Sequence, residues 1–454
     1  MIERLIGFIT LCAIASSTAI LTRGAEIPFR AGVAKAIITP SQDIWMSGYA
    51  SRKEPSQGKV HDLFAKALAL EDRHGNRIVL VTTDLIGLPA DVSEQVAAEV
   101  QKETGLPHSA LMLTSSHTHC GPVLRKNLET MYNLTGEQWE RVTQYTADLQ
   151  QKLVRVICES LEDLKPARLF RGTGSAGFAV NRRQYTLDGL TIGVNPIGPV
   201  DHDVPVLKAV DERDALIAIV FGYACHNTTL SFYQLCGDYA GFAQEYLEGQ
   251  YPGCPALFFC GCGADANPNP RGTLDLAKAH GQELSQAVQK VLAGSMTEVQ
   301  GPLRASYLVI DLPLTPAPSR TQLNEQLQNP NEYIQRRAKS LLARLDQQGG
   351  IPEKYPYPVQ VWTVGNDFNL VALAGEVVVD YSLRLKHELG RDHVWVIGYA
   401  NDVFGYIPSL RVLREGGYEA DTSMIYYGLH GPWAPQVEEM IVKTVHELVK
   451  KNQS

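Results

Sequence analysis

Strand patterns alternate with helix patterns along most of this chain, and that alternation restricts its fold more than any other feature. Short apolar runs indicate buried strands, whereas longer segments with an apolar residue every three or four positions indicate helices. The apolar runs lie at 78–83, 110–115, 216–224, 256–259, 370–373 and 394–397. The helix patterns lie at 91–104, 137–164, 239–250, 274–292, 377–388 and 436–450. The alternation predicts an α/β fold in which mixed, substantially parallel sheets are layered with helices.

One segment, 315–357, departs from this pattern. It is rich in proline, glutamine, asparagine and charged residues, and it predicts a single solvated helix at 321–347. We interpret the segment as an insertion or cap within one large domain that spans 26–454. The 454 residues of the chain are enough to bury a large core.

The first 25 residues have the pattern of a signal peptide. Arg4 supplies the positive charge, apolar residues dominate 5–21, and Gly24 and Ala25 are small residues that suit cleavage. The alternative is an uncleaved membrane anchor. The apolar stretch is barely long enough to cross a bilayer and contains several hydroxyl groups, which favours cleavage. We therefore expect an exported protein, periplasmic or secreted.

The net charge limits the possible binding partners, and the cysteine content limits the possible disulfides. The formal net charge is −8 and no long run of lysine or arginine occurs, which excludes nucleic acid as a partner. Of eight cysteines, Cys12 lies in the signal peptide, so at least one of the remaining seven lacks an internal disulfide partner. Cys260 and Cys262 indicate a packed or redox-active pair rather than a metal site, because no second pair matches them. The sequence gives neither the disulfide pairing nor the oligomeric state.

Polar side chains follow the predicted strands, at the edge where ligands collect in open α/β sheets. His117 and His119 follow one strand, and His226 follows a second. Glu376 follows a third. Residues two apart in an extended segment point to the same side, so both imidazoles of His117 and His119 can face one cavity. Two histidines and a carboxylate with an open position form a catalytic zinc set.

Each of these residues also has a structural interpretation. A histidine pair is more often hydrogen-bonded or exposed than metal-bound, and His226 could be satisfied by Asn227 or by the backbone. Glu376 could be a first-turn helix residue that the helix dipole favours. The convergence of candidate ligands from three strand ends favours the metal site over these alternatives.

Five segments, in order along the chain, resemble motifs of one enzyme family. They lie at 61–68, 114–122, 224–227 together with 237–240, 374–376, and 401–407 together with 417–420. The second is Thr-Ser-Ser-His-Thr-His-Cys-Gly-Pro, and the fourth is Ala-Gly-Glu. They resemble the catalytic N-terminal domain of the neutral (non-lysosomal) ceramidases, of which this chain looks like a divergent member.

The resemblance implies the roles of individual residues. It implies a zinc ion held by His117, His226, Glu376 and Tyr406. His119 would then serve in acid/base catalysis, and Arg182 would contact the scissile carbonyl oxygen. The expected substrate-binding residues are Arg183, Asn267 and Asp265. A surface salt bridge is the alternative for either arginine.

Two departures from the family pattern affect the expected substrate. Asn267 stands where the family has a serine, and an amide cannot act as a nucleophile, so a serine-dependent mechanism is excluded at this position. The family's C-terminal β-sandwich domain is also not expected here. The implied reaction is zinc-dependent hydrolysis of a linear amide by metal-bound water, with a ceramide-like lipid or another N-acyl amide as substrate. A peripheral contact with membranes is compatible with a lipid substrate of sphingolipid metabolism.

Three alternatives remain at this stage. The chain could be a zinc esterase with a changed substrate, or a non-catalytic exported ligand-binding protein. A cysteine nucleophile at Cys120 or Cys225 ranks below zinc, because exported thiols oxidise and neighbours in sequence need not be aligned in space.

Overall fold

The computed structural model describes residues 28–365 and 368–454, and the signal peptide expected at 1–25 lies outside them. Its largest element is a nine-stranded sheet of order β10-β9-β8-β5-β1-β2-β3-β4, with β12 beside β5. The strands are β1 (Phe29–Ile37), β2 (Phe64–Asp72), β3 (Arg77–Thr83), β4 (Leu111–Ser115), β5 (Lys165–Ser175), β8 (Asp203–Val210), β9 (Leu216–Tyr223), β10 (Ala256–Cys260) and β12 (Thr297–Val299).

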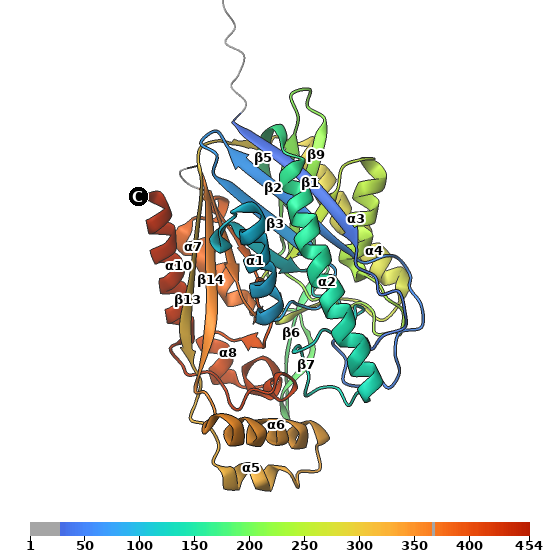
Figure 1. The fold of residues 1–454 in the computed structure, drawn as a ribbon, viewed down its shortest axis with the longest axis vertical. Helices are drawn as coiled ribbons and strands as arrows, with labels where there is room; N and C mark the ends of the chain where they lie inside the picture. Colours follow the sequence, from blue (N-terminus) through green and yellow to red (C-terminus); the bar gives the residue numbers. More distant parts are fainter. Residues whose placement is uncertain (1–27, 366–367) are drawn as a thin grey trace, which may run out of the picture.

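Four helices pack against this main sheet (Figure 1). They are α1 (Ala90–Thr104), α2 (Gly136–Glu162), α3 (Asp238–Gln250) and α4 (Leu274–Ala293). α2 packs on β1 and β2, α4 packs on β5 and β8, and α3 packs on β10. α2 begins at a capping box, in which Thr135 and Gln138 satisfy each other's backbone N–H groups. None of the described helices is long and apolar enough to cross a membrane.

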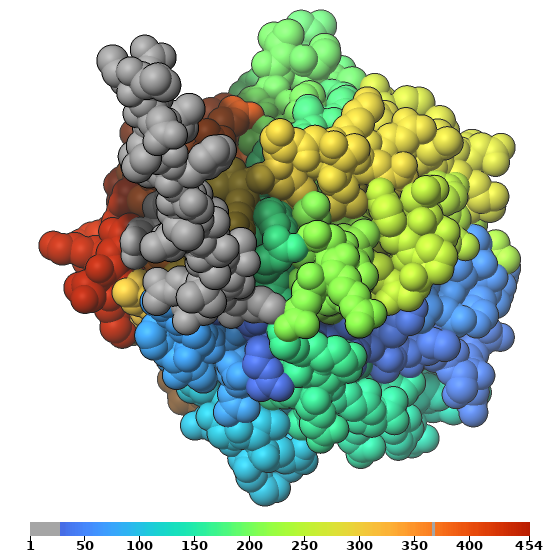
Figure 2. Space-filling view, turned by 90° about the horizontal axis from the view of Figure 1, so that it is seen from above, coloured from blue at the N-terminus to red at the C-terminus, as the bar shows by residue number. Residues whose placement is uncertain are grey.

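A second sheet of order β13-β14-β15-β17 lies beside the main sheet. Its strands are β13 (Leu303–Pro313), β14 (Lys354–Val364), β15 (Phe368–Leu373) and β17 (Val394–Ile397), and it packs against α7 (Val379–Leu389) and α10 (Val437–Gln453). Phe259 of β10 contacts Trp395 of β17, with 6.2 Å between ring centroids, so the two sheets share a core. Seen along the long axis, the C-terminal residues and the α3–α4 residues lie on opposite flanks (Figure 2).

Both sheets are mixed, which confirms the expected α/β class. Parallel pairing occurs between β3 and β4, β9 and β10, and β15 and β17, and antiparallel pairs outnumber these. Each parallel pair includes a strand that is followed by a predicted site residue. The predicted site residues therefore lie at the ends of parallel strands, and the antiparallel strands complete the two sheets.

The structure corrects the prediction for the segment at 315–357. The helix expected at 321–347 is two helices, α5 (Arg320–Gln326) and α6 (Glu332–Gln348). Pro330 lies in the break between them, where its missing N–H and the restricted residue before it disfavour one continuous helix. Ser319 and Asn331 cap the two helices separately. The pair lies at one end of the molecule (Figure 1).

A hairpin between α2 and β8 was not predicted. It consists of β6 (Ala179–Thr186) and β7 (Gly189–Asn195), and β11 (Ala266–Pro268) pairs with β6. In Figure 1 the hairpin runs from the main sheet toward the end that carries α5 and α6.

Candidate metal centre

The predicted site residues come together where the parallel strands end. His117 and His119 follow β4, and His226 follows β9. Thr118 and Asn227 pair as an isolated bridge, which places the two histidine segments side by side. Glu376 opens β16 (Glu376–Val377) and is the register partner of Tyr406 in β18 (Tyr406–Ile407).

The backbone around the cluster is held in uncommon conformations. His117, Tyr399 and Asn401 have φ values of 61°, 53° and 62°, in the left-handed region. The Asn401 side-chain oxygen accepts from the Leu113 N–H at 3.1 Å, and the Asn401 N–H donates to the Leu113 carbonyl at 2.7 Å. Such conformations persist only where the surroundings determine them, and they concentrate at functional sites.

The side chains converge on one carboxylate oxygen. Glu376 Oε2 lies 3.0 Å from His117 Nε2 and 3.1 Å from His226 Nε2. His119 Nε2 lies 3.1 Å from His117 Nε2, and Tyr406 Oη lies 3.3 Å from His226 Nε2. All five side chains are buried, with exposed fractions between 0 and 9%.

The hydrogen bonds on the far side of two rings fix their tautomers. His117 Nδ1 lies 2.6 Å from the Ile86 carbonyl, and His226 Nδ1 lies 2.9 Å from the Gly263 carbonyl. A carbonyl only accepts, so each Nδ1 carries the proton and each Nε2 of a neutral ring presents a lone pair. Burial, reinforced by Arg182, lowers the pKa of His226 to about 4, which keeps its ring neutral.

This arrangement fits a bound cation. Two nitrogen lone pairs face Glu376 Oε2, which receives no hydrogen bond from any described residue. Buried lone pairs that face a carboxylate without an intervening proton are unfavourable, and no described lysine or arginine pairs with Glu376. Imidazole nitrogens with a carboxylate oxygen fit zinc. His117, His119 and His226 also form a group whose nitrogens lie within 4.8 Å of one another, so His119 is a further candidate ligand.

Glu376 is not a first-turn helix residue. It lies in β16, and α7 begins only at Val379. Its second oxygen, Oε1, accepts a hydrogen bond from Tyr427 Oη. The helix-dipole interpretation of Glu376 therefore does not hold, and the carboxylate belongs to the cluster.

His119 occupies a cradle made by the loop at Gly48. A Cβ at Gly48 would lie 2.4 Å from His119 Nδ1, and the φ of Gly48 is +95°, so both space and backbone angle require glycine. The ring of Tyr49 lies 4.9 Å from that of His119. Burial, together with the neighbouring His117, holds the pKa of His119 well below its usual range. Its Nδ1 has no hydrogen-bond partner among the described residues.

The two adjacent arginines have different surroundings. Arg182 Nη1 lies 3.2 Å from His226 Nε2, and its Nη2 donates to Tyr406 Oη at 3.0 Å. Arg183 instead donates to Glu419 at 2.6 Å and to Glu415 at 3.0 Å. Both arginines are at least 95% buried, so the surface salt bridge considered for them is wrong. Arg182 faces the cluster, and Arg183 is engaged by carboxylates beside it.

Asn267 and Asp265 also differ in placement. Asn267 Oδ1 lies 3.4 Å from Arg182 Nη1 and 3.3 Å from Thr228 Oγ1, at the edge of the cluster. The Asp265 carboxylate accepts from the Val379 N–H at 2.9 Å and from Asn181 Nδ2 at 3.1 Å. Its backbone carbonyl accepts the Arg182 N–H at 2.7 Å. Asp265 therefore anchors the strand that carries Arg182 rather than facing the cluster with its side chain.

The cysteines give little support to a thiol nucleophile. All seven described cysteines are free. Burial raises the pKa of Cys120 to about 12, and it raises that of Cys225 well above the usual range. Because the thiolate is the reactive form, neither thiol is activated.

Sequence reasoning did not identify two groups that support the cluster. Tyr427, at the end of α9 (Met424–Tyr427), binds Glu376, and the buried Glu419 holds both Arg182 and Arg183. Glu419 lies in the π-helical turn η3 (Tyr418–Thr422). The resemblance of 417–420 to the family was the sequence signal that could have identified it. Neither residue follows a strand, so the search along strand ends passed over them.

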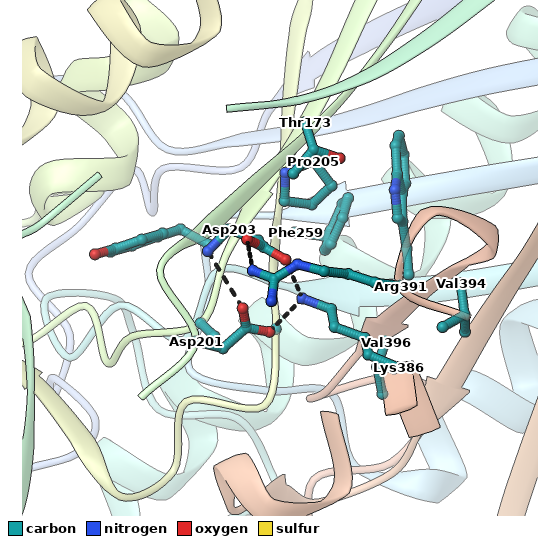
Figure 3. A pocket seen from close by; sticks show the side chains of 13 residues that line it. Thr173, Asp201, Asp203, Pro205, Phe259, Lys386, Arg391, Val394 and Val396 are labelled. Carbon is teal, nitrogen blue, oxygen red and sulfur yellow. Dashed lines mark hydrogen bonds and ion pairs between the residues drawn. The ribbon is translucent and has the colours of Figure 1, made fainter. Parts of the chain in front are cut away.

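A second group of charged residues lies apart from this cluster (Figure 3). Lys386 Nζ donates to Asp201 at 2.5 Å and to Asp203 at 2.8 Å, and Arg391 also binds Asp203. The cavity beside them measures about 20 Å³, which is room for one water molecule. These charges neutralise one another, so the group is an ion-pair network that joins α7 to β8.

Comparison with known proteins connects this geometry to a family. Residues 29–257 match the family model described as neutral/alkaline non-lysosomal ceramidase, N-terminal. Neutral ceramidase A of Dictyostelium discoideum is 25% identical over 253 residues, which are 52% of this chain and 35% of that protein. The neutral ceramidase of Drosophila pseudoobscura pseudoobscura is 26% identical over 256 residues, or 54% of this chain and 34% of that one. The matches thus span about a third of the length of these relatives.

A solved structure extends the likeness of the fold to nearly the whole chain. The crystal structure of neutral ceramidase from Pseudomonas aeruginosa superimposes with a TM-score of 0.72 at 20% identity, covering 94% of this chain and 76% of that one. The family match covers just over half of the 454 residues and includes the motifs at 61–68, 114–122 and 224–240. This chain belongs to the neutral/alkaline non-lysosomal ceramidase family.

Proposed function

We propose that this protein is an exported, zinc-dependent hydrolase of linear amides whose substrate is a ceramide-like lipid or another N-acyl amide. One observation carries the proposal: two histidines with protonated Nδ1 atoms direct their Nε2 lone pairs at the same buried carboxylate oxygen. Family membership supports amide hydrolysis as the reaction. The leader at 1–25 supports export.

In this proposal, His117, His226, Glu376 and Tyr406 would hold the zinc ion. Zinc supplies Lewis acidity, which polarises a carbonyl and makes water a nucleophile near neutral pH. The phenol oxygen of Tyr406 lies beside Arg182 Nη2, so a cation and a guanidinium would share it.

The remaining residues bind the substrate and move protons. Arg182 would donate to the carbonyl oxygen as negative charge develops there, because its guanidinium is buried and held by Glu419 at 2.8 Å. His119 would take a proton from the attacking water at Nδ1, which has no partner among the described residues, and then pass it to the leaving amine. Asn267 would hydrogen-bond the substrate next to Arg182, where a serine stands in the family pattern. Arg183 and Asp265 would act by positioning Arg182 and its strand.

Asn267 also favours a second candidate of the same chemical class, a zinc esterase. The side-chain amide of Asn267 would change the hydrogen bonding beside the substrate carbonyl, because it lies next to Arg182. The histidines and the carboxylate of the cluster would not be affected. N-acyl amides and matched esters with the same acyl chain separate the two candidates.

The experiment is elemental analysis of the mature protein together with turnover of N-acyl amides. Wild type should contain one zinc per chain and lose activity with a chelator. His117→Ala should lose both metal and activity, whereas His446→Ala, at an exposed histidine paired with Glu388, should keep both. Wild type that takes up no zinc on reconstitution would overturn the mechanism. Wild type that binds zinc and hydrolyses neither amides nor esters would make the protein a ligand-binding protein.

A further inference from the structure

The β6–β7 hairpin exposes apolar side chains to an unusual degree. Nine large hydrophobic residues are exposed in the described part of the chain, and five of them lie within 185–197. They are Tyr185, Leu187, Ile192, Val194 and Ile197. Leu187, at the tip, is fully exposed, and Ile197, just after β7, is 94% exposed. Single exposed apolar residues are ordinary, but a contiguous group marks a binding surface.

Strand register gathers several of these side chains on one face. Tyr185 pairs with Leu190, and Arg183 pairs with Ile192. Opposite residues of an antiparallel pair share a face, and alternate residues return to it. Tyr185, Leu190 and Ile192 therefore share one face, which we call the ridge, with Leu187 at the tip of the hairpin and Ile197 just after β7.

The apolar ridge leads to the candidate metal centre. β6 itself carries Arg182, which lies 3.2 Å from His226. Leu190 packs on Gly417, and a hollow of about 330 Å³ lies between 190–192 and 417–422. Tyr418 lines that hollow, and its ring lies 5.3 Å from that of Tyr406.

The charges of the ridge indicate the kind of surface it fits. Asp188 is the only charged residue in 184–198, and the chain as a whole has a net charge of −8. An anionic surface would repel such a chain, and a charged protein partner would find no complementary group on the ridge. A neutral lipid surface accepts Leu, Ile and Val side chains below its headgroups and Tyr at the headgroup level.

We propose that the β6–β7 hairpin docks on a neutral or zwitterionic lipid surface, so that a lipid amide passes from the surface into the centre beside Arg182. This inference rests on the proposed function for the identity of the transferred molecule. The docking itself does not depend on catalysis. Pairing of two copies through the unpaired edge of β7 is the competing use of the same hairpin.

The test is flotation of the full mature chain with phosphatidylcholine vesicles. Wild type should float with the vesicles, with little dependence on salt, and so should the His117→Ala variant. The double variant Leu187→Asp/Ile197→Asp should bind about tenfold more weakly or worse, because two charges would have to enter the interface. The control, Ile37→Asp/Val309→Asp, changes two exposed apolar residues on β1 and β13 and should bind like wild type.

Turnover separates this inference from the proposed function. The hairpin variant should hydrolyse a short-chain, water-soluble N-acyl amide at the wild-type rate and lose activity only toward a long-chain amide in vesicles. Unchanged flotation of the hairpin variant overturns the docking. So does a wild-type dimer that the hairpin variant converts to a monomer without any change in flotation. Wild type that floats but hydrolyses no amide overturns the proposed function and leaves the docking standing.

Discussion

The metal-centre cluster and the β6–β7 hairpin depart from ordinary protein structure in opposite directions. The cluster buries His117, His226 and Glu376 to at least 97%, whereas the hairpin exposes Leu187 completely. Polar groups usually lie outside and large apolar groups inside. One strand, β6, joins the two exceptions, because Arg182 lies at its buried end and Tyr185 at its exposed end.

The difference teaches what each region requires. A buried polar cluster must satisfy its groups internally or with a bound ion, so it is surrounded by fixed partners such as Tyr427 and Glu419. An exposed apolar ridge needs no internal partner and is completed only by something outside the protein. Changes in the cluster should therefore alter chemistry and stability together, while changes in the ridge should alter neither.

The strongest test of the cluster is Glu376→Gln. The substitution keeps the shape of the side chain and its contact with Tyr427 but removes the negative charge that faces two histidines. We expect zinc content to fall below stoichiometric and kcat/KM to fall by about 10³-fold or more, since even outer partners of a metal ligand contribute about 10–100-fold. Elemental analysis and amide turnover measure the two effects.

Glu388→Gln is the matched control for this prediction. Glu388 is a partly exposed carboxylate paired with Arg384 and His446, away from the cluster. Its loss should leave metal content and turnover unchanged. Full zinc occupancy in Glu376→Gln would show that the three histidines hold the ion without the carboxylate, as the compact histidine group allows.

The second test compares Arg182→Met with Arg183→Met. Arg182 faces the cluster, so its loss should reduce kcat by about 10²–10³-fold, the usual effect of removing an oxyanion donor. Arg183 pairs with Glu415 and Glu419, which keep Arg411 and Arg182 as partners, so its loss should destabilise the fold by about 1.5–3 kcal/mol and change kcat less. Kinetics should therefore separate the two variants, whereas denaturant unfolding should show a loss of stability in both. Equal loss of activity, with full stability in both, would contradict the separation.

The sequence predicted the cluster better than the ridge, for a physical reason. β3, β4, β9 and β15 are continuous apolar runs, and polar residues after such runs are visible without a structure. The hairpin was missed because apolar residues in a short strand look the same whether they enter a core or face solvent. Only the register and the exposed fraction of Leu187 and Ile197 distinguish the two cases.

Other parts of the site depend on contacts between distant segments. The tautomer of His117 is set by the Ile86 carbonyl, and that of His226 by the Gly263 carbonyl. Tyr427 reaches Glu376 from a different helix. No local pattern encodes such contacts, so the sequence indicates the candidate ligand types, whereas the fold determines which ring nitrogens carry protons.

The third test concerns a buried carboxyl group that no cation supports. Burial raises the pKa of Asp402 from 3.8 to about 7, while Ala90 and Tyr355 donate to it at 3.0 Å and 2.7 Å. Because the folded state binds this proton more tightly, the contribution to stability is complete below pH 3.8 and is lost as pH rises through about 7. Between these values wild type should lose up to about 4 kcal/mol relative to Asp402→Asn.

Denaturant unfolding of both proteins at several pH values measures this difference. Asn keeps an acceptor for the Ala90 N–H but cannot ionise, so it isolates the titration of one group. A difference between the two proteins that stays constant from pH 4 to 7 would mean that Asp402 is already ionised in the folded state. Asp402 would then be a buried, ionised carboxylate like Glu376, and the two groups would no longer differ in their protonation.

The smallest effect is expected in the ridge. Ile197 is 94% exposed, so Ile197→Ser removes almost no buried surface and should change the free energy of unfolding by less than about 0.5 kcal/mol. Ile219→Ser, at a fully buried position of β9, is the matched substitution and should cost several kcal/mol, because it leaves a cavity and buries a hydroxyl group. Chemical denaturation without lipid measures both. A large loss of stability in Ile197→Ser would show that this side chain packs against the protein in solution, and the ridge would then lose one end of its lipid-facing surface.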